Sequence, residues 1–314
     1  MSTIIGIDHG NGLIKTAHDQ FSTGVAVYNE VPPIETQYMV RVDNKYYVCN
    51  SGRGPLKLDK TKDETYWHLT LAGIGTELQK RKIASPPHKP KEIIIAAGLP
   101  LTYPKDDRTE LRKYLMNGEV DFWFGGKHYK VIIKDVYVYP QGYSAIMNII
   151  KDYANEPIIN VIDIGSWTVD AITVGKGGAP NMDKARSLEY GVIRCMEEII
   201  EQVRRKTKKS ITQEQIEAVL WSKKPVIMPP DIKNEIHVQT AKYVGELIEK
   251  LQENGFDTAS APAIFIGGGA GLVKQYNKKN NFFYPVFVSD IKSNAIGYEI
   301  MAAASIKKNK GKGA

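Results

Sequence analysis

Two segments with the same order of residue types could bind phosphate. Residues 4–12 and 161–170 each run from an apolar strand into an aspartate and a glycine, then through small or polar residues into a second strand. Glycines let backbone N–H groups turn toward an anion, and a carboxylate at the strand end can hold Mg²⁺ through water. Asp8 and Asp163 are the carboxylates in that position. One such turn alone would be an ordinary hairpin, but the repetition favours a nucleotide held between two related domains.

A third segment, residues 261–274, predicts a buried strand that enters a glycine turn and then a helix. Such a turn could place backbone N–H groups beside a phosphate or a ribose, although a plain strand-to-helix turn is the alternative for this segment alone. Two commoner nucleotide motifs are missing from the sequence. No third glycine follows Gly269 and Gly271 to complete the dinucleotide fingerprint, and no Gly-x-x-x-x-Gly-Lys-Ser/Thr occurs.

Taken in this order, the three segments resemble the actin-like ATPase superfamily, which also includes sugar kinases and the seventy-kilodalton heat-shock chaperones. The resemblance implies an α/β actin/hexokinase/heat-shock-ATPase fold, with two related domains around a nucleotide cleft, and ATP (or GTP) with Mg²⁺ as cofactors. The first phosphate motif is matched by Asp8, Gly10, Asn11, Gly12 and Lys15. The second phosphate motif is matched by Asp163, Gly165, Ser166, Thr168 and Asp170. The adenosine motif is matched by Gly267, Gly268 and Gly269.

The same resemblance implies roles in catalysis. Asp8 and Asp163 would hold the metal ion through water, and Lys15 would reach a phosphate. Gln141 falls where actins carry a glutamine that orients the attacking water. A neutral amide cannot take a proton at pH 7, so we expect Gln141 to position the water while Mg²⁺ and backbone donors stabilise the charge. The alternative for Gln141 is a polar residue at a helix start after Pro140.

Within the superfamily, the chain most resembles the ParM/StbA plasmid-partition proteins and their actin-like relatives. The length, the Asn-Ala-x-Gly-Tyr stretch at residues 294–298 and the Gly-Gly-Gly-Ala turn carry this likeness. It implies an ATPase coupled to polymerisation, a filament of the protein itself, and segregation of plasmid DNA through a DNA-binding adaptor at the plasmid centromere. His9 departs from the first motif, and because strand side chains alternate we expect it to point away from the site.

Other functions of the superfamily are the alternatives. A monomeric sugar-kinase-type phosphotransferase would need a carboxylate general base, for which Asp170 is the candidate, but no sugar-recognition segment is apparent. A chaperone ATPase is disfavoured because the sequence ends soon after the last predicted helix. A scaffold without activity is disfavoured because both phosphate aspartates and all three adenosine glycines are present.

Composition indicates a globular cytoplasmic protein. The 314 residues, 42% hydrophobic and 25% charged, suit two domains. The two cysteines lack metal-ligand spacing, which favours a reducing compartment. The sequence has no signal-peptide pattern and no apolar run of about 18 residues, so we expect no membrane partner. Part of the net charge of +7 lies in residues 204–209 and 307–312. These runs are interpreted as solvated ends, since no aromatic residues interleave them for base stacking.

Helix and strand signals predict a first domain of residues 1–156 plus 290–314 and a second of residues 157–289. Residues 136–146 resemble the first connecting helix of the family and residues 293–303 the second, which together would form the hinge. The elements expected in the first domain are strands over 3–49, a helix over 63–81, a strand over 92–100, a helix over 104–117, two strands within 119–139 and a helix over 141–154. The second domain is expected to hold strands over 158–164 and 167–174 and helices over 188–208, from Thr212 and over 231–254. A final helix from 290 is expected to return to the first domain.

Overall fold

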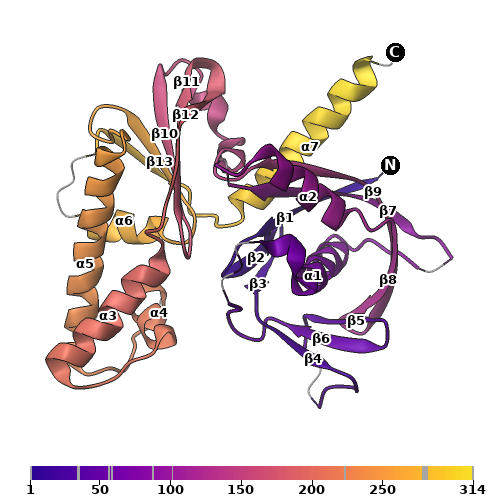
Figure 1. The fold of residues 1–314 in the computed structure, drawn as a ribbon, viewed down its shortest axis with the longest axis horizontal. Helices are drawn as coiled ribbons and strands as arrows, with labels where there is room; N and C mark the ends of the chain where they lie inside the picture. Colours follow the sequence, from indigo (N-terminus) through magenta and orange to yellow (C-terminus); the bar gives the residue numbers. More distant parts are fainter. Residues whose placement is uncertain are drawn as a thin grey trace. The chain divides into compact units, whose positions relative to one another are not determined.

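The computed structural model describes residues 2–33, 36–55, 57, 59–86, 88–100, 102–222, 224–277 and 282–312. The chain divides into two compact units (Figure 1). Unit 1 comprises Met1–Lys151 and Ile291–Ala314, and unit 2 comprises Asp152–Asp290. Within the described ranges, unit 1 contains a nine-stranded sheet and unit 2 a five-stranded sheet.

The sheet of unit 1 has the strand order β3-β2-β1-β7-β9-β8-β5-β6-β4. The bounds of its strands are β1 (Thr3–His9), β2 (Leu13–Thr16), β3 (Gln20–Ser22), β4 (Val25–Tyr28), β5 (Met39–Val42), β6 (Lys45–Cys49), β7 (Lys91–Leu99), β8 (Glu119–Phe124) and β9 (Lys127–Pro140). The neighbours β1, β7 and β9 are parallel. Apolar residues dominate β1 and β7 because strands covered on both faces need them. The carboxyl ends of these three strands therefore lie at one edge of the sheet.

Three helices accompany this sheet: α1 (Glu64–Lys80), α2 (Lys105–Leu115) and α7 (Ser293–Lys312). Helix α1 begins at Asp63, whose side chain accepts a hydrogen bond from the N–H of Thr65. It lies within the curve of the sheet (Figure 1), and nearly every residue from Tyr66 to Leu78 is buried. A helix buried on most sides needs apolar or small residues around most of its circumference, which explains the run from Leu69 to Gly75.

Helix α7 packs on the sheet of unit 1 through close backbone contacts. A side chain at Gly6 in β1 would place its Cβ only 2.0 Å from the carbonyl oxygen of Ala295. A side chain at Gly297 would place its Cβ 1.8 Å from the carbonyl oxygen of Ser144. These distances leave room only for glycine, so the Asn-Ala-x-Gly-Tyr stretch is explained in part by the packing of this helix.

A partly buried ionic network fixes the same helix. The Arg81 guanidinium, at the end of α1, bonds the carboxylates of Glu77 and Glu299 and the carbonyl oxygen of Ile4. Glu299 of α7 also accepts a hydrogen bond from the N–H of Gly6, with 2.8 Å between nitrogen and oxygen. Burial raises the pKa of Glu299. Strand β1, helix α1 and helix α7 are thereby joined through charged groups as well as apolar contacts.

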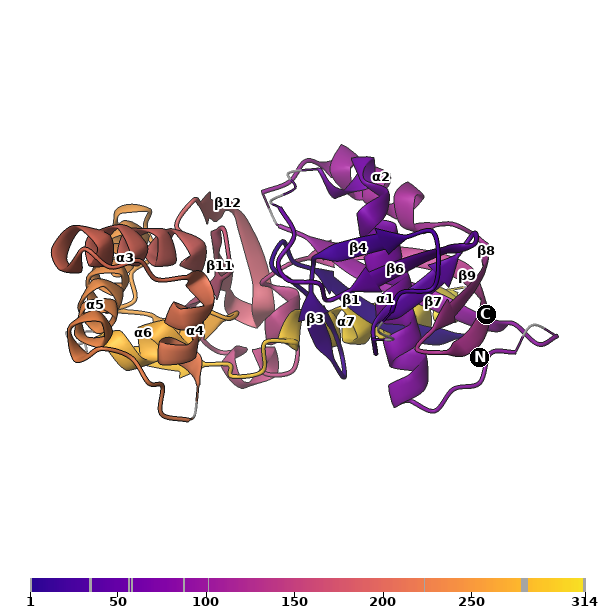
Figure 2. The same cartoon turned by 90° about the horizontal axis from the view of Figure 1, so that it is seen from below.

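The sheet of unit 2 has the order β12-β11-β10-β13-β14. Its strands are β10 (Ile158–Ile164), β11 (Val169–Gly175), β12 (Ala179–Leu188), β13 (Pro262–Ile266) and β14 (Tyr284–Phe287). The helices described in unit 2 are α3 (Val192–Thr207), α4 (Gln213–Trp221), α5 (Pro230–Glu253) and α6 (Ala270–Tyr276). The strands β10, β13 and β14 are parallel. Helices α3 and α5 lie side by side (Figures 1 and 2), and their apolar residues share one core with the sheet.

Most predicted elements are confirmed, and local chemistry explains two of their turns and ends. Asp43 and Asn44 have φ angles of 49° and 60°, as a two-residue hairpin between β5 and β6 requires. Thr212 and Gln215 form a capping box at the start of α4, the helix predicted from Thr212.

The helix predicted over residues 141–154 is wrong, and so is the connecting helix predicted over 136–146. Residues 136–140 belong to β9, and two short 3₁₀ turns follow, η2 (Ser144–Ile146) and η3 (Ile150–Tyr153). Gly142 has a φ of 77°, which breaks a helix at its start. The second connecting helix is confirmed, although it begins at Ser293 rather than at 290.

Two strands of unit 2 were not predicted. Strand β12 occupies residues expected to be a loop, and α3 therefore begins at Val192 instead of 188. Nearly all of β12 is exposed, so it lacks the apolar alternation that marks a half-buried strand. Strand β14 is also largely exposed at the other edge of this sheet.

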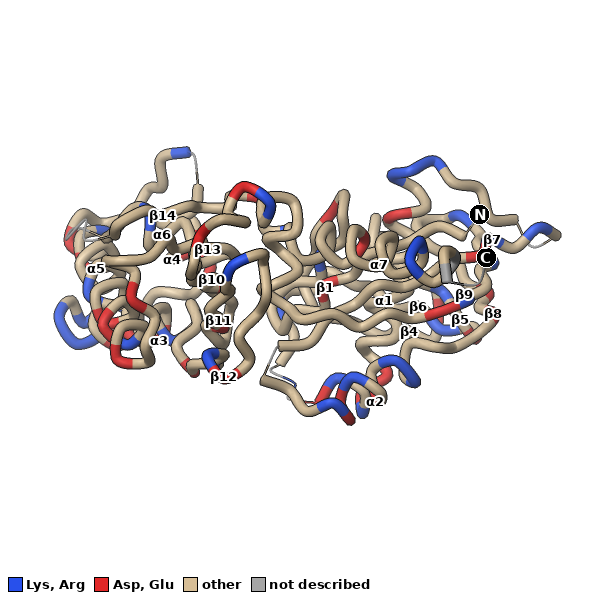
Figure 3. Tube along the Cα trace, turned by 90° about the horizontal axis from the view of Figure 1, so that it is seen from above, with Lys and Arg blue, Asp and Glu red and all other residues tan. Residues whose placement is uncertain are grey.

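The basic run at the end of α3 is partly neutralised within unit 2. The Lys206 ammonium lies 2.8 Å from a carboxylate oxygen of Glu235, and the Lys209 ammonium lies 3.0 Å from one of Asp231. Figure 3 shows basic and acidic residues close together at this end of α3. None of the described helices is both long and apolar enough to cross a membrane.

Candidate nucleotide site

The first hairpin places its aspartate and its lysine face to face. Asp8 in β1 and Lys15 in β2 are register partners, so their side chains share one face of the antiparallel pair. The Lys15 ammonium nitrogen lies 3.1 Å from a carboxylate oxygen of Asp8, and Asp8 is only 1% exposed. The residues predicted to contact a metal ion and a phosphate therefore lie together at the strand end.

The loop of this hairpin is held by three residues that the sequence analysis did not single out. The Tyr66 hydroxyl donates to the side-chain oxygen of Asn11, with 3.2 Å between the oxygens. The Thr23 hydroxyl donates to the backbone carbonyl oxygen of Asn11 over 2.9 Å. The Lys60 ammonium donates to the carbonyl oxygen of His9. These residues come from different parts of the chain, and no local motif marks them. Their contacts fix the backbone between the two strands before any ligand binds.

The His9 side chain turns into the core of unit 1, as strand alternation predicts. Its Nε2 lies 2.8 Å from the hydroxyl oxygen of Thr70 in α1. That hydroxyl donates to the carbonyl oxygen of Tyr66, so it accepts from His9, which assigns the proton to Nε2. Burial, and secondly the charge of Lys60, lower the pKa of His9 to about 4. The imidazole is therefore neutral at pH 7.

Gln141 lies at the same sheet edge as Asp8. It directly follows β9, and its N–H donates to the carbonyl oxygen of Leu99 at the end of β7 over 2.8 Å. Because β1, β7 and β9 are adjacent and parallel, Asp8 and Gln141 both lie where these strands end, with one strand between them. Gln141 thus occupies a turn at this edge and not the helix start that its alternative interpretation assumed.

The second hairpin has the same form but a different charge pattern. Asp163 in β10 faces Asp170 in β11, where the first hairpin pairs an aspartate with a lysine. The Thr168 hydroxyl donates to a carboxylate oxygen of Asp170 over 3.0 Å, and the Gly165 N–H donates to the Thr168 carbonyl over 2.9 Å. Like charges opposite each other are unfavourable. A cation on this face would therefore be favoured.

Backbone hydrogen bonds join this second loop to two other turns of unit 2. The first two N–H groups of α3 donate to the loop, from Val192 to the carbonyl of Gly165 over 3.1 Å and from Ile193 to that of Ser166 over 2.9 Å. The N–H of Gly269 in the glycine turn donates to the carbonyl of Ile164 over 3.0 Å. The loop of the second hairpin and the glycine turn, about a hundred residues apart in the sequence, are therefore brought together.

Gly267 shows how closely these two motifs approach. Its φ of 83° is a conformation that side chains disfavour, and a Cβ at this position would lie 2.4 Å from a carboxylate oxygen of Asp163. A Cβ at Gly268 would meet nothing within 4 Å, so the backbone there is open. The glycine turn thus supports the Asp163 carboxylate on one side and leaves accessible backbone beside it.

The carboxylates of each hairpin, taken separately, fit a magnesium nucleotide better than a metal held by protein alone. In the described part of the chain, no three His, Cys, Asp or Glu side chains are grouped as a metal site. Mg²⁺ typically keeps several waters and binds one or two carboxylates together with phosphate oxygens. Asp8 in unit 1 and the pair of Asp163 and Asp170 in unit 2 are carboxylates of this kind.

Two family models match the chain. A model described as "Actin like proteins N terminal domain" matches residues 6–143, and one described as "Archaeal actin homologue MreB-like, C-terminal" matches residues 161–278. The first includes hairpin β1–β2 and Gln141, and the second includes hairpin β10–β11 and the glycine turn. No curated protein matches the chain.

Solved actin-like structures share its fold along nearly the whole length. The archaeal actin homologue Ta0583 in complex with ADP is 18% identical, with a TM-score of 0.75, and the match covers 96% of this chain and 99% of Ta0583. The ParM of a 15-stranded filament from Clostridium botulinum is 19% identical, with a TM-score of 0.77 and coverage of 97% and 100%. The actin-like protein Alp7A is 13% identical, with a TM-score of 0.74 and coverage of 99% and 98%.

The predicted fold class is confirmed by these matches, since the chain has the two-domain α/β fold of actin-like proteins. The resemblance deduced from the three motifs is confirmed as well. The chain belongs to the actin-like protein family.

Proposed function

We propose that this protein binds and hydrolyses ATP, or GTP, with Mg²⁺, and that hydrolysis is coupled to assembly of a filament from copies of the chain. The repeated hairpin carries the proposal: each unit of an actin-like fold ends a buried strand with an aspartate beside a glycine loop. The ADP complex of the archaeal homologue Ta0583 supports nucleotide binding.

In unit 1, we assign phosphate binding to the backbone of Gly10, Asn11 and Gly12 and to Lys15. Asp8 would hold Mg²⁺ through water, with Lys15 orienting this buried carboxylate. Mg²⁺, when bound, neutralises charge on the β- and γ-phosphates. The Gln141 amide would orient the attacking water, because it can both donate and accept hydrogen bonds but cannot take the proton.

In unit 2, we assign the second metal carboxylate to Asp163 and phosphate binding to the backbone and hydroxyl groups of its loop. The residues with this phosphate role are Gly165, Ser166 and Thr168. Gly267, Gly268 and Gly269 would contact the adenosine, since the backbone at Gly268 is open. Asp170 faces Asp163 and would bind the same cation rather than act as a base.

We further propose that the filament segregates plasmid DNA in the cytoplasm through an adaptor protein, with assembly in the nucleotide-bound state and disassembly after hydrolysis. The ParM from Clostridium botulinum and Alp12 have solved filament structures, and the chain shares their fold. Contacts in a filament can promote cleft closure, which would couple assembly to hydrolysis.

Right-angle light scattering with simultaneous phosphate detection tests this function. Mg·ATP is added to the purified protein, with Mg·GTP and a non-hydrolysable analogue as comparisons. We expect scattering to rise and then fall as phosphate appears, and to remain high with the analogue. Phosphate release without scattering would contradict the filament and favour a phosphotransferase of the sugar-kinase type. Absence of both signals with both nucleotides would contradict the proposed activity.

A further inference from the structure

We propose that strand β4 (Val25–Tyr28) is an interaction surface through which filaments of this protein join side by side, each β4 pairing with the β4 of a second copy. The inference rests on the proposed filament and goes beyond it, because the contact that lengthens a filament and the contact that joins two filaments are separate. Its basis is that β4 is a sheet edge without the features that normally prevent strand pairing.

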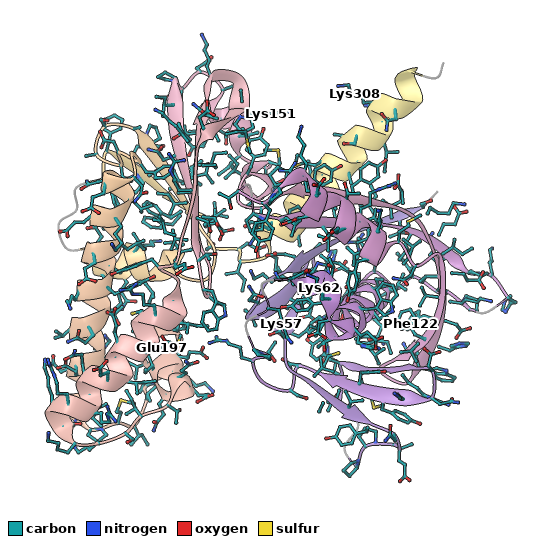
Figure 4. The ribbon with its side chains drawn as sticks, viewed as in Figure 1. Lys57, Lys62, Phe122, Lys151, Glu197 and Lys308 are labelled. Carbon is teal, nitrogen blue, oxygen red and sulfur yellow. The ribbon has the colours of Figure 1, made fainter. Side chains whose placement is uncertain are left out.

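Strand β4 lies at one end of the nine-stranded sheet (Figures 1 and 2). Among the described strands it pairs with β6 alone. An interior strand such as β8, which carries Phe122 (Figure 4), has a neighbour on each side, β5 and β9. The outward N–H and C=O groups of β4 are therefore not used by any strand in the described ranges. Such a row of backbone groups is a template for one more strand.

The other edge of the same sheet, β3, is protected. It has only three residues, and side chains occupy its N–H groups. The N–H of Gln20 donates to a carboxylate oxygen of Asp19 over 2.9 Å. The N–H of Ser22 donates to the side-chain oxygen of Asn50 over 2.8 Å. A further strand would have to break both hydrogen bonds before it could pair with β3.

Both edges of the sheet in unit 2 are protected as well. Strand β12 contains Pro180 and the charged residues Asp183 and Lys184, and its pairing with β11 is interrupted by a shift of register. Strand β14 contains Pro285, which has no N–H to donate. Proline, charge and bulges are the means by which natural proteins keep sheet edges from pairing.

Strand β4 lacks these forms of protection. Its sequence, Val-Ala-Val-Tyr, contains no charged residue, proline or glycine, and its register with β6 is continuous. Within the part of the chain that the structure describes, no side chain accepts a hydrogen bond from its N–H groups. Apolar side chains are also exposed at its outer end: Val27 is 58% exposed, Tyr28 40% and, just beyond the strand, Val31 65%. Neighbouring exposed apolar side chains of this kind mark an interaction site.

A second β4 is the partner that these properties favour. Two β4 strands side by side bring no charged residue opposite another, so nothing in the strand itself repels its copy. Four residues span only about 14 Å, and the contact is far smaller than the about 1,000 Å² that a stable interface buries. Two isolated molecules would therefore associate weakly. A filament presents β4 many times, and linked weak contacts together give strong binding.

The pairing of identical strands also decides which contact this can be. When the same patch is used on both copies, the contact closes after two molecules. Filament growth instead needs a head-to-tail contact between two different patches, because only that contact can repeat without end. Pairing through β4 therefore cannot lengthen a filament, but it can join a filament to its neighbour.

The test uses filaments assembled with a Mg-bound non-hydrolysable ATP analogue. High-speed sedimentation collects all filaments, and low-speed sedimentation collects only bundles. Val27→Lys places a like charge on both strands of the pair, which weakens each contact about two- to fivefold. Because the contacts along a filament act together, we expect the low-speed pellet to be lost while the high-speed pellet remains. Filaments of Val27→Lys and of Val27→Glu, assembled separately and then mixed, should bundle again.

Val238→Lys is the matched control, since it makes the same change at a valine of α5 that is 46% exposed. It should bundle like the wild type. Wild-type bundling of Val27→Lys, or equal loss in both lysine variants, would overturn the role of β4.

Two further outcomes would also overturn it. Wild-type filaments that remain single would leave β4 to a strand of a different protein, and failure of Val27→Lys to form filaments would place β4 in the contact that lengthens them. Absence of wild-type filaments from the high-speed pellet would instead contradict the proposed function, and the side-by-side contact with it.

Discussion

The side-chain oxygen of Asn294, the second residue of α7, accepts a 2.9 Å hydrogen bond from the backbone N–H of Gly142. Asn294 is 4% exposed, so the bond is shielded from water. Gly142 directly follows Gln141, the proposed water-orienting residue. The start of α7 therefore sets the conformation of the turn that carries Gln141.

Replacing Asn294 by alanine should destabilise unit 1 and slow hydrolysis. The change leaves the buried Gly142 N–H without its acceptor, which costs about 1–3 kcal/mol of the free energy of unfolding. Urea denaturation followed by circular dichroism measures the loss of unfolding free energy. Phosphate release measures the rate of hydrolysis. Asn117→Ala is the control, because that exposed asparagine also makes one backbone hydrogen bond. Equal stability of the two variants would exclude a role for Asn294 in fixing the turn.

Gln141→Ala should slow phosphate release while filament assembly remains. The backbone hydrogen bond from Gln141 to Leu99 does not depend on the side chain, so the fold at the sheet edge is kept. Misplacing an attacking water costs about a hundredfold in rate when positioning is its main source of catalysis. Scattering with a non-hydrolysable analogue should equal that of the wild type. Wild-type phosphate release would remove Gln141 from the mechanism.

His9 should make stability depend on pH. Its pKa falls from 6.5 to about 4 on folding, so below pH 6.5 the unfolded chain binds a proton that the folded chain does not. The contribution is complete above pH 6.5 and is lost as the pH falls toward 4, by about 3 kcal/mol in total. Urea denaturation at pH 7, 6 and 5 should show a smaller decline for His9→Gln than for the wild type. Parallel declines would contradict a neutral buried imidazole.

Asp163→Ala should abolish Mg²⁺-dependent nucleotide binding. Asp163 is 5% exposed and faces Asp170, so its loss removes one of the two carboxylates from that face. Calorimetric titration with nucleotide in the presence of Mg²⁺ and of EDTA measures the effect. Asp183→Ala, in the exposed strand β12, serves as the control and should bind normally. Unchanged affinity of Asp163→Ala would refute the metal assignment.

Gly267→Ala should be more harmful than Gly177→Ala although both glycines have positive φ angles, 83° and 72°. Each substitution incurs about 1–2 kcal/mol of backbone strain. A Cβ at Gly177 meets nothing within 4 Å, whereas one at Gly267 would lie 2.4 Å from the Asp163 carboxylate. We therefore expect Gly177→Ala to lower the stability of the protein and leave its nucleotide affinity unchanged. Gly267→Ala should lower both the stability and the nucleotide affinity. Melting temperatures and binding titrations of both variants decide this.

The sequence could predict features whose cause lies within a few residues. The two hairpins, the cap of α1 at Asp63 and the capping box at Thr212 are of this kind, because turn and cap chemistry is local. The parallel arrangement of β10 and β13 joins the second hairpin to the glycine turn. No local pattern indicates this pairing, because the two strands are about a hundred residues apart.

Other features depend on tertiary structure and could not be predicted. Lys60, Tyr66 and Thr23 contact the first phosphate loop from separate segments, and nothing in their neighbourhood indicates those contacts. The segment after Pro140 has apolar residues at helical spacing, but Gly142 adopts a positive φ and bonds to α7. Strand β12 was missed because an exposed edge strand shows no apolar alternation.

The bond between the Gly6 N–H and Glu299 has a consequence for how the protein is made. These residues are 293 positions apart, and ribosomes add about 5–20 residues per second, so β1 waits about 15–60 s for its partner. The contiguous segment of unit 2 emerges during that interval and can fold first. Until α7 is synthesised, β1 and β7 expose the apolar surface that the helix later covers, so this face of unit 1 stays open to non-native contacts while unit 2 emerges.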